Sequence, residues 1–340
     1  MSPLLEELES LPPLRILQLI FTGFALFLLV FLALLLFLPP DIYGTPAVVV
    51  DNATASGPPI VVTHSFLFKN HTETVTVAVN RSVYEASKRT HRNLLLFGEQ
   101  KLAGTRYYGA MIADPSQEQI VTDLISEFRR IRAERNLTDD EYLELIAAGI
   151  QSITYKDGGN APPKYPAELL VGRMGDCDDK SVLISGLLAR EGYAVALFKF
   201  GPEGHMSMGV GSDAFLYKST GYTYLEGMSP AYVGFPTAHL LMSMDSDPLV
   251  IPVGNGTKVY HSGNETQYIA AMSNCAKERA AALSVRMEQY PVPERNSTEY
   301  RALATERDRY TMIRDYINGH PYDRPGTYAY LQREMAGESG

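Results

Sequence analysis

The stretch Gly175-Asp-Cys-Asp-Asp-Lys180 decides how this sequence is read, because it places a cysteine where a loop turns into a helix. Apolar residues follow at helical spacing and the pattern stops at Gly192, so a helix is predicted between them. Unpaired backbone N–H groups at a helix start favour a thiolate over a thiol. Cys177 is therefore the candidate nucleophile.

His205 is the candidate base for this thiol. An acyl-transfer thiol needs a base within hydrogen-bond reach and a third group that orients the base. His205 begins a predicted strand, residues 205–211, directly after the turn Gly201-Pro-Glu-Gly204. From that place its ring can face the start of a helix.

Glu226 is the candidate orienting acid, because it ends a second predicted strand at residues 222–226. On antiparallel strands it faces His205 directly if the chain turns near residues 215 and 216. A further strand at residues 215–218 would instead separate the two side chains. Asp213 is the alternative acid in that arrangement.

Three carboxylates flank the candidate thiol, at Asp176, Asp178 and Asp179. Acidic side chains are favoured at the cap and in the first turn of a helix, so we interpret them as caps rather than as ligands of a divalent cation. Their charges oppose thiolate formation, and activation then depends on His205 and on the helix start. No metal site and no cofactor are predicted, since the glycine motifs that bind nucleotides are missing.

The remaining cysteine and histidines are expected to be structural or exposed. Cys275 is expected to be free on a helix. A disulfide with Cys177 is the alternative, and it would leave Cys177 without a free thiol for nucleophilic attack. The other histidines are His64, His71, His91, His239, His261 and His320, and several of them lie beside glycosylation motifs or near chain ends.

Residues 16–38 form an N-terminal apolar segment of 23 residues without a charged side chain. At about 1.5 Å per residue, a helix of this length spans a hydrocarbon core of about 30 Å. A cleaved signal peptide is the rival interpretation, but the run is too long and the residues before it include Glu6, Glu7 and Glu9 rather than a basic cluster. The segment is predicted to anchor the chain in a lipid bilayer.

Residues beyond the anchor are expected to lie outside the cell. Arg15 abuts the N-terminal end of the apolar segment and the next cationic residue is Lys69, so the sparse positive charge lies on the N-terminal, cytoplasmic side. N-linked glycans are added only to chain that reaches the outer side, and N-x-[ST] motifs exceed the about 1.4 expected by chance. The seven motifs begin at Asn52, Asn70, Asn80, Asn136, Asn255, Asn264 and Asn296.

The hydrophobic patterns predict a mixture of strands and helices. Strands are expected at residues 60–68, 73–79, 193–200, 205–211 and 222–226, with a shorter pair around residues 250 and 259. Helices are expected at residues 82–92, 116–135, 138–150 and 267–318, the last broken at 290–293, while residues 93–115 are expected to be irregular. Thr138 followed by Glu141 predicts a capping box at the start of one helix.

This order predicts an α+β protein with one transmembrane helix. The chain has 340 residues and 45% hydrophobic content, ample for a core, and its net charge of −9 argues against a nucleic-acid partner. Its expected parts are a cytoplasmic leader (1–15), a transmembrane helix (16–38), a tether (39–59), an outer domain (60–262), a helical C-terminal region (263–336) and a disordered tail (337–340).

A succession of short motifs resembles the transglutaminase-like superfamily, in particular membrane-anchored proteins of archaea. The motifs are Tyr165-Pro-Ala-Glu168, Gly175-Asp-Cys-Asp-Asp179, Gly192-Tyr193, His205-Met206 and Tyr224-Leu-Glu226. The resemblance implies a papain-like fold, in which a helix with the cysteine at its start packs on an antiparallel sheet that presents the histidine and the acid. It also implies Cys177 as nucleophile, His205 as base and Glu226 as orienting acid.

Two features depart from that family. Its members usually carry Asp where Glu226 stands, which lengthens the reach by one methylene, and they often place a Trp near the site, whereas this chain has none. The oxyanion would then depend on the backbone N–H of Cys177 and on a second donor. Gln151 and Tyr165 are the candidates for that donor, or for a supporting role.

These residues together suggest a membrane-anchored extracellular enzyme that forms a thioester at Cys177 and passes the acyl group to water or to an amine. The expected substrate is protein or cell-envelope peptide, so peptidase, amidase and transglutaminase activities are all compatible with the motifs. The alternative is a transglutaminase-like surface scaffold or binding module that has lost the chemistry.

Overall fold

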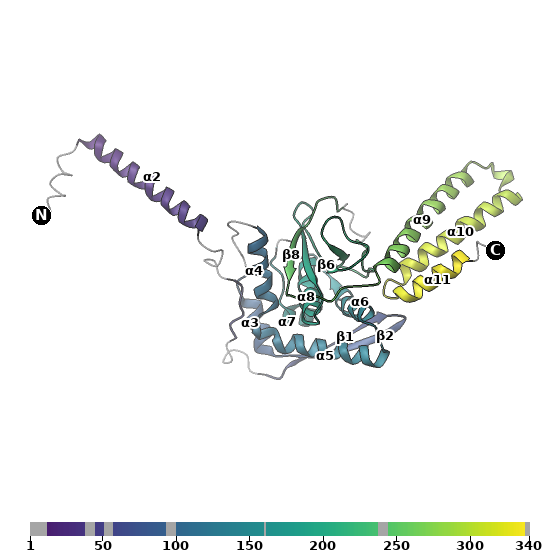
Figure 1. Cartoon of the computed structure of the whole chain (residues 1–340), viewed down its shortest axis with the longest axis horizontal. Coiled ribbons are helices and arrows are strands. Elements are labelled where there is room, and N and C mark those ends of the chain that lie inside the picture. The colour runs from purple at the N-terminus through teal and green to yellow at the C-terminus, as the bar shows by residue number, and fades with distance from the viewer. Residues whose placement is uncertain are drawn as a thin grey trace.

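The computed structural model describes residues 12–37, 45–50, 57–92, 100–159, 161–236 and 244–336. Figure 1 shows one helix, α2 (Pro13–Phe37), apart from a body of helices and small sheets, with three further helices at the far end of that body. The predicted mixture of helices and strands with one N-terminal apolar helix is therefore confirmed.

Helix α2 is long and apolar enough to cross a membrane, over Pro13–Leu34. It begins three residues before the predicted segment, and Leu38, the last predicted residue, lies outside the described residues. Part of the predicted tether is described at residues 45–50. There the backbone N–H of Val48 donates to Asp114 Oδ2 at 2.8 Å, so this part lies against the body.

The predicted hairpin is present as β1 (Ile60–Phe68) and β2 (His71–Val79), which pair antiparallel from Ile60 with Val79 to Phe68 with His71. The connection has two residues where four were expected. Lys69 and Asn70 have φ of 47° and 61°, and left-handed backbone at both central residues suits a tight hairpin turn.

Four helices follow the hairpin in the chain: α3 (Arg81–Arg89), α4 (Gln100–Ile112), α5 (Glu118–Arg135) and α6 (Asp139–Gln151). Of these, α5 packs on β2 and α6 on β1. The capping box of α6 is confirmed, since Thr138 N–H donates to Glu141 Oε2 at 2.9 Å and Glu141 N–H donates to Thr138 Oγ1 at 3.3 Å. The expectation of irregular chain before residue 116 is wrong for α4. Its two glycines weakened the helical pattern, but Gly104 lets α4 approach β8 (Leu249–Val253), where a Cβ would lie 2.8 Å from Ile251 Cδ1.

The central sheet has the order β7-β6-β5-β8 and is antiparallel throughout, with β5 at Val195–Phe200, β6 at His205–Gly211 and β7 at Tyr222–Leu225. Helix α8 (Cys177–Arg190) packs on β5 and β6. The predicted pairing of residues near 250 and 259 is wrong, because β8 pairs with β5. Lys258 and Tyr260 instead form single bridges with Tyr193 and Ser212.

Short elements lead into the cysteine helix. Strand β3 (Thr154–Tyr155) pairs in parallel with β4 (Met174–Gly175), and α7 (Pro166–Gly172) lies between them in the chain. Because β4 ends two residues before Cys177, the pair fixes the path by which the chain enters α8.

The C-terminal helices are α9 (Gly263–Glu288), α10 (Thr298–Gly319) and α11 (Arg324–Ala336), which lie side by side in Figure 1. Buried Arg324 joins them to the body, since its guanidinium bonds Glu144 Oε1 on α6 at 2.6 Å and also bonds Glu265 on α9. Tyr232 makes a second link through its hydroxyl, which lies 2.7 Å from the carbonyl of His320.

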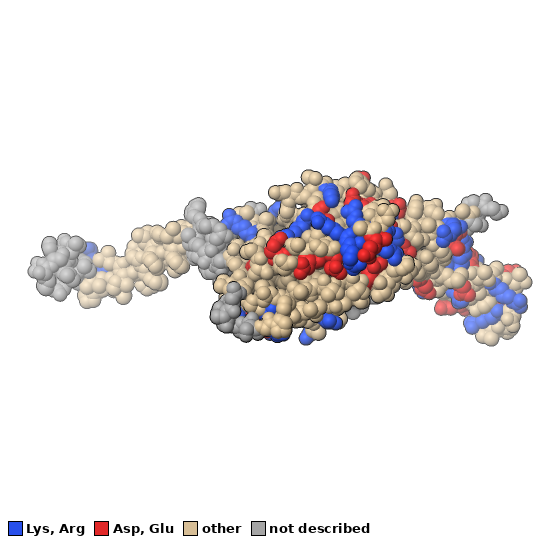
Figure 2. Space-filling model, turned by 90° about the horizontal axis from the view of Figure 1, so that it is seen from below, with Lys and Arg blue, Asp and Glu red and all other residues tan. Residues whose placement is uncertain are grey.

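Figure 2 shows charged side chains of both signs side by side on the lower face of the body, whereas α2 carries almost none. Helix α5 accounts for several of the pairs. Arg130 lies 2.8 Å from Glu134, and Arg132 lies 2.6 Å from Asp139. Such exposed pairs contribute little stability each, so the body depends chiefly on its apolar core.

We expect Gly256→Ala to destabilise the fold. A Cβ at this position would lie 2.1 Å from the backbone oxygen of Tyr193, which no side-chain rotation can relieve. The strain should lower the free energy of unfolding by about 1–3 kcal/mol, measured as a fall in the Tm of the detergent-solubilised chain. Gly201→Ala, where no atom lies within 4 Å of the new Cβ, is the matched control. Equal Tm values for the two variants would contradict the packing described.

Candidate active site

Carboxylates cap the start of α8. The N–H of Asp179 donates to Asp176 Oδ1 and the N–H of Asp176 donates to Asp179 Oδ2, each at 3.1 Å. Lys164 binds Asp179 as well, through its Nζ at 2.5 Å and its N–H at 2.6 Å. Two of the three carboxylates are thus accounted for as caps, as the sequence suggested.

The thiol of Cys177 is buried, at 8% exposure, beside the third carboxylate. Its Sγ donates to Asp178 Oδ1 at 3.4 Å. Burial raises the pKa of Cys177 well above its usual range and the charge of Asp178 adds to the rise, while a hydrogen bond from the backbone of Met206 opposes it. The helix start does not outweigh these effects, so the resting group is a neutral thiol and needs a base.

His205 and Glu226 form a buried pair, with 3.5 Å between His205 Nε2 and Glu226 Oε2. Tyr224 donates its hydroxyl to the same Oε2 at 2.8 Å, and the N–H groups of Gly227 and Met228 donate to Oε1 at 2.8 Å and 2.9 Å. Burial alone would raise the pKa of Glu226, but its bonds with His205, Met228 and Tyr224 hold it below the ordinary value. The acid is therefore a carboxylate.

The strand register makes this pair diagonal. The sequence led us to expect that Glu226 faces His205 directly, and this is wrong. Met208 lies opposite Leu225, so Glu226 extends toward the position opposite Ser207. The turn lies between residues 212 and 221, and Phe215 and Lys218 have positive φ and form no strand. Diagonal neighbours remain within reach of long side chains, and the extra methylene of Glu226 suits this offset.

The side chains of His205 and its neighbour Met206 point to opposite faces of β6. Side chains alternate along a strand, so Met206 and Met208 pack in the core with α8, while His205 stacks on Phe200 with ring centroids 6.2 Å apart. Within the described ranges, no hydrogen bond joins Cys177 Sγ to either ring nitrogen of His205. With Nε2 engaged by the acid, Nδ1 is the nitrogen free to serve the thiol.

Three other predicted site residues have different places. Gln151 donates its Nε2 to the backbone oxygen of Glu226 at 2.6 Å, so it supports the acid. Tyr165 is fully buried ahead of α7, under the guanidinium of Arg92 at 5.5 Å from its ring centroid. Asp213 is exposed and lies 3.3 Å from His261 Nδ1, so the structure pairs it with a different histidine.

Sequence reasoning missed two residues at the acid. Tyr224 stands two positions before Glu226 on one strand, a spacing that places both side chains on one face. Lys180 is fully buried and donates its Nζ to the backbone of Met228 at 2.9 Å. Its burial had no signal in the sequence, because a lysine on a helix is ordinarily exposed.

The remaining cysteine and most remaining histidines lie away from these groups. Cys275 is exposed on α9, and both cysteines are free. His64 bonds Ser152 at 2.7 Å and His320 bonds the carbonyl of Tyr316 at 2.7 Å. His71 and His91 are exposed, and His239 lies outside the described residues.

Every predicted glycosylation site that the structure describes is exposed. These are Asn70, Asn80, Asn136, Asn255, Asn264 and Asn296, whereas Asn52 lies outside the described residues. In the same part of the chain, no group of three or more His, Cys, Asp or Glu side chains is placed to hold a metal ion.

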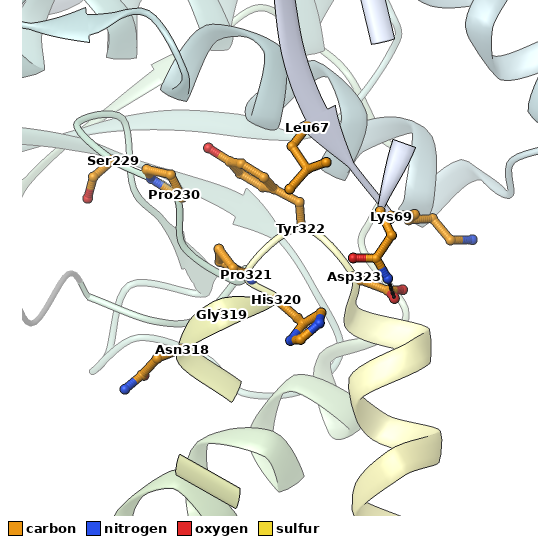
Figure 3. A pocket seen from close by; sticks show the side chains of 11 residues that line it. Leu67, Lys69, Ser229, Pro230, Asn318, Gly319, His320, Pro321, Tyr322 and Asp323 are labelled. Carbon is orange, nitrogen blue, oxygen red and sulfur yellow. Dashed lines mark hydrogen bonds between the residues drawn. The ribbon is translucent and has the colours of Figure 1, made fainter. Parts of the chain in front are cut away.

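A cavity of about 350 Å³ lies between the tip of the β1–β2 hairpin and the connection from α10 to α11. Figure 3 shows Leu67 beside the ring of Tyr322, Lys69 at the end of the hairpin, and His320 below them in the view. Neither Cys177 nor the His205–Glu226 pair lines this cavity. The candidate catalytic residues lie elsewhere, at the start of α8, at the start of β6 and just after the end of β7.

The arrangement combines a buried thiol at a helix start with a histidine whose second nitrogen is held by a carboxylate. A thiol, a base and an oriented acid are the groups that nucleophilic acyl transfer requires. No protein-family model, no curated protein and no solved structure matches this chain.

We expect Asp178→Asn to make the thiol more reactive. Removing the adjacent charge should lower the pKa of Cys177, and a fall of about half to one pKa unit raises the thiolate fraction about threefold to tenfold. The rate of carboxamidomethylation by iodoacetamide at pH 8, followed by peptide mass spectrometry, measures the change. Asp123→Asn on α5 is the control. A rate for Asp178→Asn equal to that of the control would show that this charge does not govern the thiol.

Proposed function

We propose that the chain is a membrane-anchored extracellular cysteine acyl-transfer enzyme of the transglutaminase-like type. The observation that carries the proposal is the buried His205–Glu226 pair, which leaves Nδ1 of His205 free at the end of the sheet on which the cysteine helix packs. A cysteine helix on an antiparallel sheet that carries histidine and acid on adjacent strands also agrees with the papain-like arrangement.

The first step is acylation of Cys177. Its Sγ rotates from Asp178 toward His205, and Nδ1 takes the thiol proton as sulfur bonds the substrate carbonyl carbon. The electron pair of the C=O bond moves onto oxygen, near the backbone N–H of Cys177 at the start of α8. When the C–N bond breaks, the imidazolium returns its proton to the leaving amine. A thioester remains on Cys177.

The second step releases the acyl group. Water or an amine gives a proton to neutral His205 and attacks the thioester carbon, after which the C–S bond breaks and sulfur recovers the proton. Glu226 stays ionised throughout and stabilises the imidazolium each time it forms, since its pKa is held low. The proposed substrate is protein or cell-envelope peptide.

The proposed location follows from α2 and from the glycosylation motifs. One helix suffices to anchor the chain in a bilayer. All of the described motif asparagines are exposed and lie on the C-terminal side of this helix, which favours an outer position for the body and a cytoplasmic N-terminus.

One observation favours a second candidate function. The thiol bonds Asp178 and, within the described residues, makes no hydrogen bond with His205, and burial and charge raise its pKa. A protein in which Sγ cannot leave Asp178 would be an inactive surface scaffold or binding module. Catalytic hydrogen bonds are often long before substrate binds, so a reaction distinguishes the two candidates better than the resting distance.

We expect a small activated ester such as p-nitrophenyl acetate to acylate Cys177 faster than the exposed Cys275. His205→Ala should slow acylation of Cys177 by about 10²–10⁴-fold, because the base is lost, and Glu226→Gln should slow it in the same direction. Release of p-nitrophenolate gives the rate, and peptide mass spectrometry assigns the acyl group to a cysteine.

Two controls belong to this experiment. His261→Ala removes a histidine that also lies beside a carboxylate but is exposed, so it should leave the rate unchanged. Cys275 in the same sample reports any general change in thiol access. Equal, slow acylation of both cysteines, unaffected by His205→Ala, would refute the enzyme and support the scaffold.

We expect glycopeptides from intact cells to carry N-linked sugars at exposed motifs such as Asn136 and Asn255. The enzyme that attaches them acts only on the outer side, so occupancy reports topology. Mass spectrometry of the membrane fraction measures it, with Asn93, an asparagine outside any motif, as the internal control. Unmodified asparagines at every motif would contradict the proposed orientation.

A further inference from the structure

Lys180 lies three residues after Cys177 on α8 and is completely buried, at 0% exposure. Lysine is almost never fully buried unless its charge is compensated. Its Nζ donates to three backbone oxygens, those of Gln151 at 3.1 Å, Met228 at 2.9 Å and Ile153. Since an ammonium has three N–H donors, the three carbonyls satisfy it fully.

Two of these three carbonyls belong to residues that also bond Glu226. Gln151, at the end of α6, donates its side-chain Nε2 to the backbone oxygen of Glu226 at 2.6 Å. Met228 donates its N–H to the carboxylate of Glu226 at 2.9 Å. Lys180 therefore binds the cysteine helix to two of the chain segments that hold the acid in place.

Two nearby carboxylates, Glu226 and Asp179, favour the charged form of Lys180. Burial lowers the pKa of Lys180 to about 8, and the nearby charges of Glu226 and Asp179 oppose that fall. The side chain is thus an ammonium at neutral pH. A buried positive charge near the buried carboxylate offsets part of the cost of removing both from water.

We propose that Lys180 is a positioning residue that fixes Glu226, and through it His205, relative to Cys177. It does not touch the reacting atoms. It sets the spacing between the helix that carries the nucleophile and the strand end that carries the acid. This role deepens the proposed function and rests on it. We call the three hydrogen bonds of Lys180 Nζ the clamp, and their effect on the chain around Glu226 can be measured without catalysis.

The experiment compares Lys180→Gln with the wild type as full-length, detergent-solubilised protein. Glutamine keeps two donors and loses the charge and the reach. Hydrogen–deuterium exchange of the peptide that contains residues 224–230 is expected to speed up about tenfold, because the N–H groups of Gly227 and Met228 lose their fixed partner. Acylation of Cys177 by p-nitrophenyl acetate is expected to slow at least tenfold.

Gly256→Ala is the matched control, since it strains the same domain without touching the acid. Faster exchange confined to residues 224–230 in Lys180→Gln, and absent from Gly256→Ala, supports the clamp. Exchange at wild-type rate in that peptide, or a uniform increase shared by both variants, overturns it. If Lys180→Gln does not fold, Lys180→Arg, which keeps the cation and lengthens the side chain, is judged by the same pattern.

The two proposals fail in different ways. Local exchange that depends on Lys180, together with wild-type acylation no faster at Cys177 than at Cys275, supports the clamp and refutes the enzyme. Fast acylation at Cys177 that depends on His205 but is unchanged in Lys180→Gln upholds the enzyme and overturns the positioning role.

Discussion

The structure depends on keeping one carboxylate charged inside the protein. Glu226 is fully buried, and an isolated buried charge would cost several kcal/mol. His205, Tyr224 and two backbone N–H groups bond its oxygens, and Lys180 binds the backbone of Met228 and Gln151, which themselves bond Glu226. Because these partners come from α8, β6, β7 and the end of α6, satisfying one charge holds together the elements that form the candidate site.

The surroundings of Cys177 favour the neutral form of its side chain, whereas those of Glu226 favour the charged form. The charges of Asp178 and Asp176, which flank Cys177, raise its pKa, so the resting structure protects a neutral thiol rather than a thiolate. A buried neutral thiol resists chance alkylation and oxidation. Under the proposed mechanism, reactivity appears only when a substrate brings Sγ to Nδ1 of His205. The oriented histidine, rather than the helix start, is then the source of activation.

Much of the fold could be predicted from local patterns. The hairpin, the capping box at Thr138 and the strand at His205 follow from alternation and from side-chain chemistry. Helix α4 was missed because its two glycines weaken the helical pattern, and the close packing that Gly104 permits is revealed only by tertiary structure. In the candidate site, Glu226 was found from its place at a strand end, but the diagonal register depends on turn geometry. The burial of Lys180 depends on three carbonyls from distant segments and had no local signal.

The central claim is that Cys177 carries out acyl transfer at the cell surface, and its most direct test is a comparison of intact cells that carry the wild-type chain or Cys177→Ala. Mass spectrometry of the cell-envelope proteins would identify cross-linked and cleaved peptides in each. The account predicts cross-links that disappear, or envelope peptides that stay uncleaved, in the variant at unchanged abundance of the chain. Identical peptide sets in the two strains would contradict it.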